Sequence, residues 1–356
     1  GDHATVTDVT FVSSFEGGER YAAGAVTVLN LHGSHYQMGR QYGILMKYDM
    51  TSLYNSAING RFIGQENFTY DRLKQIAYSV YSVYPQKFKD VIIGMSETSG
   101  LGLEKQIILN AIEMFPKYDS FVPKLCSGIA VWGDYTGGGP LVFGRNNDDT
   151  DYYREFGAYT IVAVFHPTDS GQPTAIVNYA GVIYAPSGMN RDGVFLELNS
   201  GNVEWLYPDR PLIFLSLFSF LEDYSTLSEL YPAFLSIKGN ATLGSIVNVA
   251  DGHEAFSYEI SAVYDPTKEN DDVKQKSQDR PGLLVATNHF VDPSWGIAPP
   301  APDKDEQYSW TVKRRDNLLT LAERYKGSFD VERMKQVLDT KIDDGGATQP
   351  TGTIYQ

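Results

Sequence analysis

The chain has 356 residues, of which 42% are hydrophobic and 21% are charged, a composition that provides a large apolar core. Its 29 basic and 44 acidic side chains give a formal net charge of −15, which repels phosphate backbones and anionic membrane surfaces. We therefore expect no nucleic-acid partner. We also expect no membrane span, because no stretch reaches the roughly 18 apolar residues that a spanning helix needs.

The N-terminal third of the chain is predicted to be mostly helical. Residues 1–24 are polar and contain glycine, which indicates a loose lead or an edge strand. Val26 to Leu31 is a predicted strand that ends at Gly33. Apolar residues then recur at helical spacing over residues 35–59, and three further helices are predicted over 70–84, 88–97 and 103–114, each followed by proline or glycine.

From Cys126 onward, short apolar runs alternate with turn residues, a pattern typical of strands. The predicted strands are 129–132, 140–144, 159–165, 174–179, 181–184, 194–198, 245–250, 255–261 and 282–287. Helices are predicted over 212–223, from Thr226 onward behind a capping-box pattern, and over 309–325 and 331–341. The charged and polar residues 265–281 indicate a surface loop.

Cys126 is the only cysteine of the sequence. It cannot form an intramolecular disulfide, so it is either a small buried hydrophobic residue or a reactive group. The cluster Gly144-Arg145-Asn146-Asn147-Asp148 follows the next predicted strand. A fixed positive charge from Arg145 beside the sulfur would favour the thiolate, which is the nucleophilic form. The alternative is a polar turn in which Arg145 forms a weak surface ion pair.

A helical block followed by a strand-rich block that starts Cys126-Ser127-Gly128 resembles the N-terminal-nucleophile hydrolases. The branch resembled holds penicillin acyltransferase, penicillin V acylase and bile salt (choloylglycine) hydrolase. Two upstream segments also resemble this branch: Leu31-His32-Gly33-Ser34-His35-Tyr36-Gln37-Met38-Gly39-Arg40-Gln41-Tyr42-Gly43 and Ser96-Glu97-Thr98-Ser99-Gly100-Leu101. The resemblance implies an α+β fold, a four-layer αββα sandwich over residues 126–356, preceded by a helical segment over 1–125 that is a propeptide or small subunit.

The resemblance also implies that the chain cuts itself between Leu125 and Cys126. Cleavage frees an α-amine with a pKa of about 8, so that one residue carries both the nucleophile and its base. Asp148 is similar in position to the family aspartate that orients this amine. Leu125 departs from the small residue found before the cut in parts of the branch.

Three further side chains are candidates through the same resemblance. Asn199 and Asn288, each at the end of a predicted strand, are similar to the residues that hold the oxyanion; asparagine at such a position is otherwise often a turn former. Arg314 or Arg315 is similar to the arginine that closes the site. A run of basic residues on a helix is otherwise typical of a solvated face.

From these residues we predict a hydrolase acting on linear amide carbon–nitrogen bonds of a small N-acyl substrate through an acyl-thioester. An acyltransferase, or a non-catalytic binding protein in which Cys126 is buried and unprocessed, remains as an alternative. No cofactor or metal is expected, because the six histidines are scattered and no phosphate-binding glycine motif precedes a helix. A homo-oligomer is possible. The acidic charge, the 24 tyrosines and an expected removed N-terminal segment favour a periplasmic or secreted protein.

Overall fold

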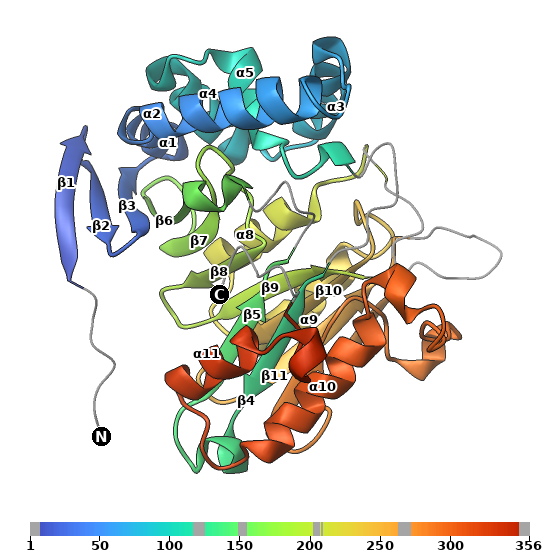
Figure 1. The fold of residues 1–356 in the computed structure, drawn as a ribbon. Helices are drawn as coiled ribbons and strands as arrows, with labels where there is room; N and C mark the ends of the chain where they lie inside the picture. The colour runs from blue at the N-terminus through green and yellow to red at the C-terminus, as the bar shows by residue number, and fades with distance from the viewer. Residues whose placement is uncertain are drawn as a thin grey trace. The chain divides into compact units, whose positions relative to one another are not determined.

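The computed structural model describes residues 8–116, 125–148, 155–201, 207, 209–262 and 272–348 (Figure 1). Packing divides the chain into two compact units. Unit 1 comprises Gly1–Ser120, Glu155–Arg191 and Pro208–Tyr224, and unit 2 comprises Phe121–Arg154, Asp192–Tyr207 and Ser225–Gln356. Each unit combines segments that are distant in sequence. The predicted boundary between residues 125 and 126 concerns processing of the chain and stays a prediction.

The strands of unit 1 form a continuous sheet in the order β1, β2, β3, β6, β7, β8. Neighbouring strands are antiparallel except β3 and β6, which are parallel. Their bounds are β1 (Val9–Phe15), β2 (Gly18–Ala23), β3 (Val26–Gly33), β6 (Thr160–Pro167), β7 (Thr174–Tyr179) and β8 (Ser187–Asn190). The polar N-terminal lead is therefore a strand pair, β1 and β2, at one edge of this sheet.

The predicted helices of unit 1 are present, and one of them is divided. The helices are α1 (His35–Leu45), α2 (Lys47–Leu53), a π-helix (Tyr54–Ile63), α3 (Tyr70–Ser82), α4 (Gln86–Ser99), α5 (Leu103–Asn110) and α8 (Ile213–Asp223). A single helix over residues 35–59 was the expectation, but α1 ends at Leu45 and Met46 is its C-cap residue. The Leu45 carbonyl accepts a hydrogen bond from Arg20, which also pairs with Asp49 at 2.9 Å. A distant side chain thus takes the acceptor that a continuous helix would use.

Helices α1 and α4 pack with their backbones in contact because glycine lies where they meet. A Cβ atom added to Gly39 would lie 2.2 Å from the Val91 carbonyl oxygen, and one added to Gly94 would lie 2.2 Å from that of Tyr36. Ser34 begins α1 with a capping box, in which Gln37 is the reciprocal partner. The glycine in the upstream motif therefore has a packing role.

The predicted strand over residues 181–184 is wrong. This segment is a turn whose backbone groups bond to side chains instead of a neighbouring strand. Gly181 N–H donates to the Tyr42 hydroxyl and Ile183 N–H donates to Asn110 Oδ1, both at 2.8 Å, while Asn178 Nδ2 donates to the Tyr184 carbonyl at 2.9 Å. These polar partners satisfy the buried backbone without a sheet ladder.

Unit 2 contains two antiparallel sheets. One has the order β9 (Phe195–Ser200), β10 (Ser245–Ala250), β11 (Ala255–Ile260), β12 (Val273–Lys276), and the other has the order β13 (Leu283–Ala286), β4 (Ser127–Val131), β5 (Val142–Asn146). Strand β12 corrects the expectation of a loop over 265–281. Its polar residues are compatible with a strand because it pairs with β11 at the end of the sheet.

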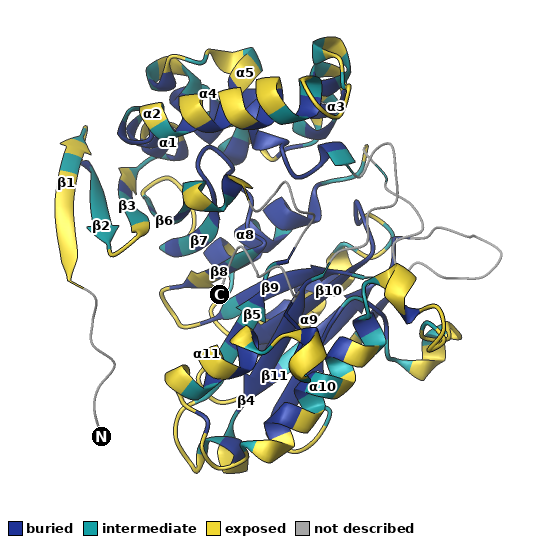
Figure 2. Ribbon diagram, viewed as in Figure 1, coloured by how far each residue is buried: buried dark blue, intermediate teal, exposed yellow. Residues whose placement is uncertain are grey.

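The layers of unit 2 confirm the predicted αββα sandwich. Small apolar residues fill the space between the sheets: Ala130, Ala250, Ala255 and Leu284. On the outer face of the three-stranded sheet, α10 (Thr311–Arg324) and α11 (Val331–Asp339) bury Ile129, Val131 and Val285. On the outer face of the other sheet, the Phe234 ring of α9 (Leu227–Ser236) stacks on Tyr258 of β11 at 4.4 Å. Figure 2 shows buried strands and helices α10 and α11 with exposed outer sides. Within the described residues, no helix is long and apolar enough to cross a membrane.

Candidate active site

All six predicted site residues belong to unit 2. Cys126 immediately precedes β4, Arg145 lies in β5, Asn199 lies in β9, and Arg314 lies in the first turn of α10. Asp148 and Asn288 each follow the end of a strand, β5 and β13 respectively. Side chains alternate between the two faces of a strand. Ala130 faces the space between the sheets, so Gly128, two residues earlier, faces it too. Cys126, a further two residues earlier and just before β4, lies on the same side.

The Cys126 sulfur is buried among polar groups. The residue is 2% exposed, its Sγ donates to Asn147 Oδ1 at 3.5 Å, and the Asp148 carbonyl oxygen lies at 3.9 Å. Arg145 Nη2 is 3.8 Å from the sulfur. A buried structural cysteine is expected to have apolar neighbours, whereas a guanidinium at this distance stabilises a thiolate.

Arg145 is held on two sides. Its Nη2 donates to the Leu198 carbonyl at 2.6 Å and to Asn147 Oδ1 at 3.2 Å, and its Nε lies 3.0 Å from Glu197 Oε2. The Glu197 side chain is fully buried. Burial raises the pKa of Glu197, while Arg145 and a hydrogen bond from Asn248 act to lower it. The guanidinium beside the sulfur is therefore part of a buried ion pair.

Glu197 was not among the predicted site residues. Its signal in the sequence is a single acidic residue within the predicted strand 194–198. An ionisable residue at a buried strand position needs a charged or hydrogen-bonded partner. The partners Arg145 and Asn248 lie on other strands, so the sequence pattern marks the residue without identifying them.

Arg314 contacts the peptide bond that precedes the candidate nucleophile. Its Nη1 donates to the carbonyl oxygens of Leu125 at 3.2 Å and Cys126 at 2.9 Å, and its Nη2 donates to Asn288 Oδ1 at 2.8 Å. Burial lowers the pKa of Arg314 to about 10, opposed by the charges of Asp148 and Cys126. The side chain thus remains cationic at neutral pH.

The two adjacent arginines, which the sequence could not distinguish, have different contacts in the structure. Arg314 is fully buried at the Leu125–Cys126 peptide, whereas Arg315 pairs with Asp279. The start of α10 is fixed by Asp305, whose carboxylate accepts the backbone N–H groups of Val312 and Lys313 at 3.0 and 2.9 Å. This cap sets the position of the first helical turn and therefore of Arg314.

Asn199 and Asn288 join the end of β9 to the segment that follows β13. Asn199 Nδ2 donates to the Ala286 carbonyl at 3.3 Å, and Asn288 Nδ2 donates to the Ser200 carbonyl at 2.7 Å. The backbone N–H of Asn288 donates to Thr311 Oγ1 at 2.8 Å, which connects the same segment to α10. Each amide nitrogen carries two hydrogens, and each of these bonds uses one.

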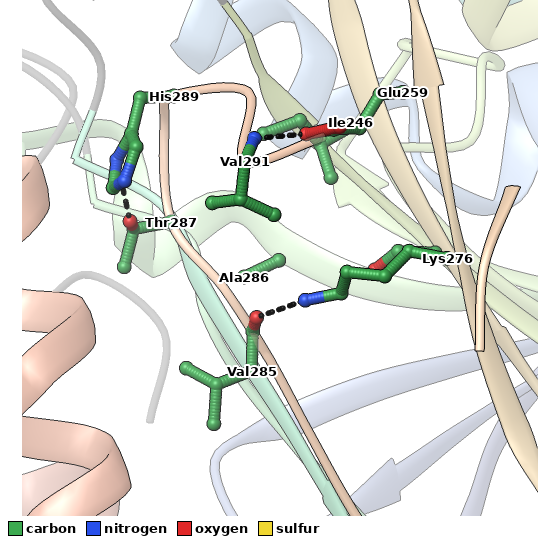
Figure 3. Close-up of a pocket in the computed structure, with 9 residues that line it drawn as sticks. Ile246, Glu259, Lys276, Val285, Ala286, Thr287, His289 and Val291 are labelled. Carbon is green, nitrogen blue, oxygen red and sulfur yellow. Dashed lines mark hydrogen bonds between the residues drawn. The ribbon is translucent and has the colours of Figure 1, made fainter. Parts of the chain in front are cut away.

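A small cavity lies between β10, β11, β12 and β13, near Asn288 (Figure 3). It offers about 10 Å³, roughly the space of one water molecule. Lys276 Nζ donates to the Val285 carbonyl at 3.3 Å, and burial lowers the pKa of His289 to about 4. The cavity is too small for an acyl substrate.

Among the described residues, no group of three or more His, Cys, Asp and Glu could hold a metal ion.

Comparison with known proteins gives relatives of low identity. No protein-family model matches the sequence. The curated protein named Protein dcd1B, from Dictyostelium discoideum, is 24% identical over 211 residues, which are 52% of this chain and 41% of that protein. The match thus spans about two fifths of the length of this relative.

Similar solved structures include the following three. The Caenorhabditis elegans N-acylethanolamine-hydrolyzing acid amidase ortholog is 18% identical, with a TM-score of 0.45 over 60% of this chain and 86% of that chain. The conjugated bile acid hydrolase of Clostridium perfringens is 13% identical, with a TM-score of 0.40 over 64% of this chain and 83% of that chain. Penicillin V acylase of Agrobacterium tumefaciens is 10% identical, with a TM-score of 0.34 over 65% of this chain and 67% of that chain. These are N-terminal-nucleophile hydrolases, the family that the sequence resembles. The αββα layers of unit 2 are established by its own strand pairing and packing.

Proposed function

We propose that the chain is a cysteine amidohydrolase that cleaves a linear amide bond of an N-acyl substrate, after self-cleavage between Leu125 and Cys126. One arrangement carries this proposal: a guanidinium lies on each side of the cysteine. Arg145 is 3.8 Å from the sulfur, and Arg314 donates to the Leu125 carbonyl oxygen at 3.2 Å. The first charge favours the thiolate, and the second favours negative charge on the oxygen of the bond that would be cut.

These positions support the proposed self-cleavage, in which the two guanidinium groups stabilise the charges that develop. The Cys126 thiol releases its proton to water, its sulfur adds to the Leu125 carbonyl carbon, and the carbonyl oxygen becomes an oxyanion beside Arg314. The carbon–nitrogen bond then breaks, the nitrogen takes up a proton to become the free amine of Cys126, and Leu125 is left as a thioester on the sulfur. One water molecule hydrolyses this thioester, which gives the Leu125 carboxylate and restores the thiol.

Turnover of a substrate repeats the same chemistry with the new chain end. The α-amine of Cys126 accepts the thiol proton, and the sulfur adds to the substrate carbonyl carbon. As the carbon–nitrogen bond breaks, the proton passes from the amine to the leaving nitrogen. Water then hydrolyses the acyl-thioester, which releases the acid and the thiol.

The remaining residues stabilise charge and orientation in this proposal. The second N–H of each of the two amides, Asn199 and Asn288, is available for the substrate oxyanion, as is Arg314 after cleavage. Asp148 lies close enough to Arg314 to oppose the lowering of its pKa. We assign Asp148 the role of binding and orienting the freed α-amine.

The test is a comparison of the wild-type chain with Cys126→Ala, and Ser127→Ala as the adjacent control. We expect wild type and Ser127→Ala to give fragments of 125 and 231 residues (356 minus 125), the larger beginning Cys-Ser-Gly. Cys126→Ala should stay uncut and inactive toward a panel of N-acyl amides, and mass spectrometry should trap an acyl adduct on Cys126 in the wild type and in Ser127→Ala. Cleavage or turnover in Cys126→Ala would refute the mechanism.

The two alternatives give different results in the same experiment. An acyltransferase forms the adduct but passes the acyl group to an added amine in preference to water. A binding protein on this scaffold stays uncut in the wild type and forms no adduct.

A further inference from the structure

A row of polar side chains crosses one sheet of unit 2 behind Arg145. Glu197 in β9 is the direct cross-strand partner of Asn248 in β10, which is in turn the partner of Ser257 in β11. These residues are 0%, 1% and 1% exposed. They face the other sheet, since Glu197 and Asn248 approach Gly128 of β4. Three neighbouring buried polar residues on one sheet face need mutual hydrogen bonds.

The hydrogen bonds of this row run in one direction. The Ser257 hydroxyl donates to Asn248 Oδ1, and Asn248 Nδ2 donates to Glu197 Oε1. The second carboxylate oxygen, Glu197 Oε2, is 3.0 Å from Arg145 Nε. Because the serine occupies the amide oxygen, the amide presents its N–H to the carboxylate. The reverse orientation would place two oxygens against each other.

The row packs closely against the opposite sheet at Gly128. A Cβ atom added to Gly128 would lie 2.2 Å from Glu197 Oε1 and 3.0 Å from Asn248 Nδ2. The backbone of β4, two residues after Cys126, therefore packs directly against the carboxylate and the amide. A change in the row is transmitted to the position of Glu197, because the opposite sheet prevents it from moving away.

We propose that Asn248 and Ser257 are positioning residues for the reaction: they keep Glu197 ionised and oriented, so that Glu197 holds Arg145 beside the Cys126 sulfur. This inference rests on the proposed function. The other hydrogen bonds of Arg145 go to neutral oxygens: its Nη2 donates to the Leu198 carbonyl and to Asn147 Oδ1. Glu197 is its charged partner among the contacts described, so the charge of Glu197 fixes the guanidinium more strongly than they do.

Electrostatics agree with this arrangement. Burial raises the pKa of Glu197, and the charge of Arg145 and the Asn248 hydrogen bond counteract the rise. Removing the amide N–H therefore removes one of the two groups that keep the carboxylate ionised. A protonated Glu197 would still fill the space but would no longer attract the guanidinium.

The experiment measures the pKa of Glu197 directly, by a carbon-13 NMR titration of the chain labelled at glutamate carboxyl carbons. Glu197→Gln assigns the signal. Leucine has nearly the same shape as asparagine but lacks its amide N–H. We therefore expect Asn248→Leu to raise the pKa of Glu197 by about 1–2 units, because the charged carboxylate loses one hydrogen bond. Ser257→Ala should raise it by less. Ser245→Ala, on the opposite face of β10, is the matched control and should leave it unchanged.

The rate of self-cleavage gives the second measurement. Asn248→Leu should slow cleavage, with the lost rate recovered as the pH is raised above the new pKa of Glu197, and it should add no loss in a Glu197→Gln chain. An unchanged pKa in a folded Asn248→Leu protein, or equal losses in both backgrounds, would overturn the inference. If Cys126→Ala is still cut, the proposed function fails, but the titration of Glu197 still decides how the row acts.

Discussion

His35 in unit 1 lies between two carboxylates, and this arrangement predicts a defined pH dependence of stability. Its Nδ1 is 2.8 Å from Asp169 Oδ1 and its Nε2 is 2.9 Å from Glu222 Oε2. The imidazole is fully buried, and Phe88 packs edge-on against it. Lys87 pairs with the other oxygen of Glu222 at 2.9 Å. Both ring nitrogens donate only if the ring is an imidazolium, and the four charges then sum to zero.

The sign of the effect follows from the direction of the shift. Burial alone would lower the pKa of His35, but its hydrogen bond to Glu222 and the charges of Glu222 and Asp169 outweigh this, so the pKa is raised above 6.5. The stabilisation is therefore fully present below the unfolded pKa of 6.5 and is lost as the pH rises through the folded pKa. A single proton gives a slope of at most about 1.4 kcal/mol per pH unit in that window.

The perturbation is His35→Gln. The bond to Glu222 is buried and should contribute about 1.5–3 kcal/mol, whereas Asp169 has a side chain 40% exposed and its share is discounted to about 0–1 kcal/mol. We expect the variant to lose about 1.5–4 kcal/mol of unfolding free energy at pH 5.5 and less above the folded pKa.

The assay is urea denaturation of both chains at a series of pH values, followed by circular dichroism. Lys105→Gln, a substitution of a lysine outside this cluster, controls for general charge effects. A difference between wild type and His35→Gln that stays constant from pH 5.5 to 9, or that grows as the pH rises, would refute the assignment of a buried imidazolium.

Three further predictions concern unit 2. Arg314→Met should slow self-cleavage about 10²-fold or more, because the Leu125 oxygen loses its charged donor; the rate is followed by electrophoresis, and an equal effect of Arg315→Met would contradict the assignment. Asn199→Ala should lower kcat by about 10²–10³ with little change in KM, and a change confined to KM would exclude an oxyanion role. Gly128→Ala should destabilise the protein by about 1–3 kcal/mol in thermal denaturation, since its Cβ would lie 2.2 Å from Glu197; an unchanged Tm would show that the sheets can separate there.

Features that depend on neighbours along the chain could be predicted from the sequence. The helical spacing of apolar residues and the proline or glycine after each helix located the helices of unit 1, because these signals act over one or two turns. Short apolar runs bounded by turn residues located most strands of unit 2, and the strand predicted over residues 129–132 is β4, which begins at Ser127, next to Cys126. The positions of Asn199 and Asn288 at strand ends followed from the same patterns together with the family resemblance, whereas the structure shows that the two strand ends are in contact.

Features that depend on groups distant in the sequence could not be predicted and are seen only in the folded chain. The end of α1 at Leu45 requires Arg20, and the turn at 181–184 requires Tyr42 and Asn110. Arg314 and Arg315 are equivalent by composition, and the docking of α10 determines which one faces Leu125. Glu197 acquires Asn248 through the register of β9 and β10, and Arg145 through the packing of the other sheet of unit 2 against β9. A buried charge is tolerated only where oppositely charged or hydrogen-bonding groups converge on it, and that convergence is a property of the packed sheets, which no local stretch of sequence contains.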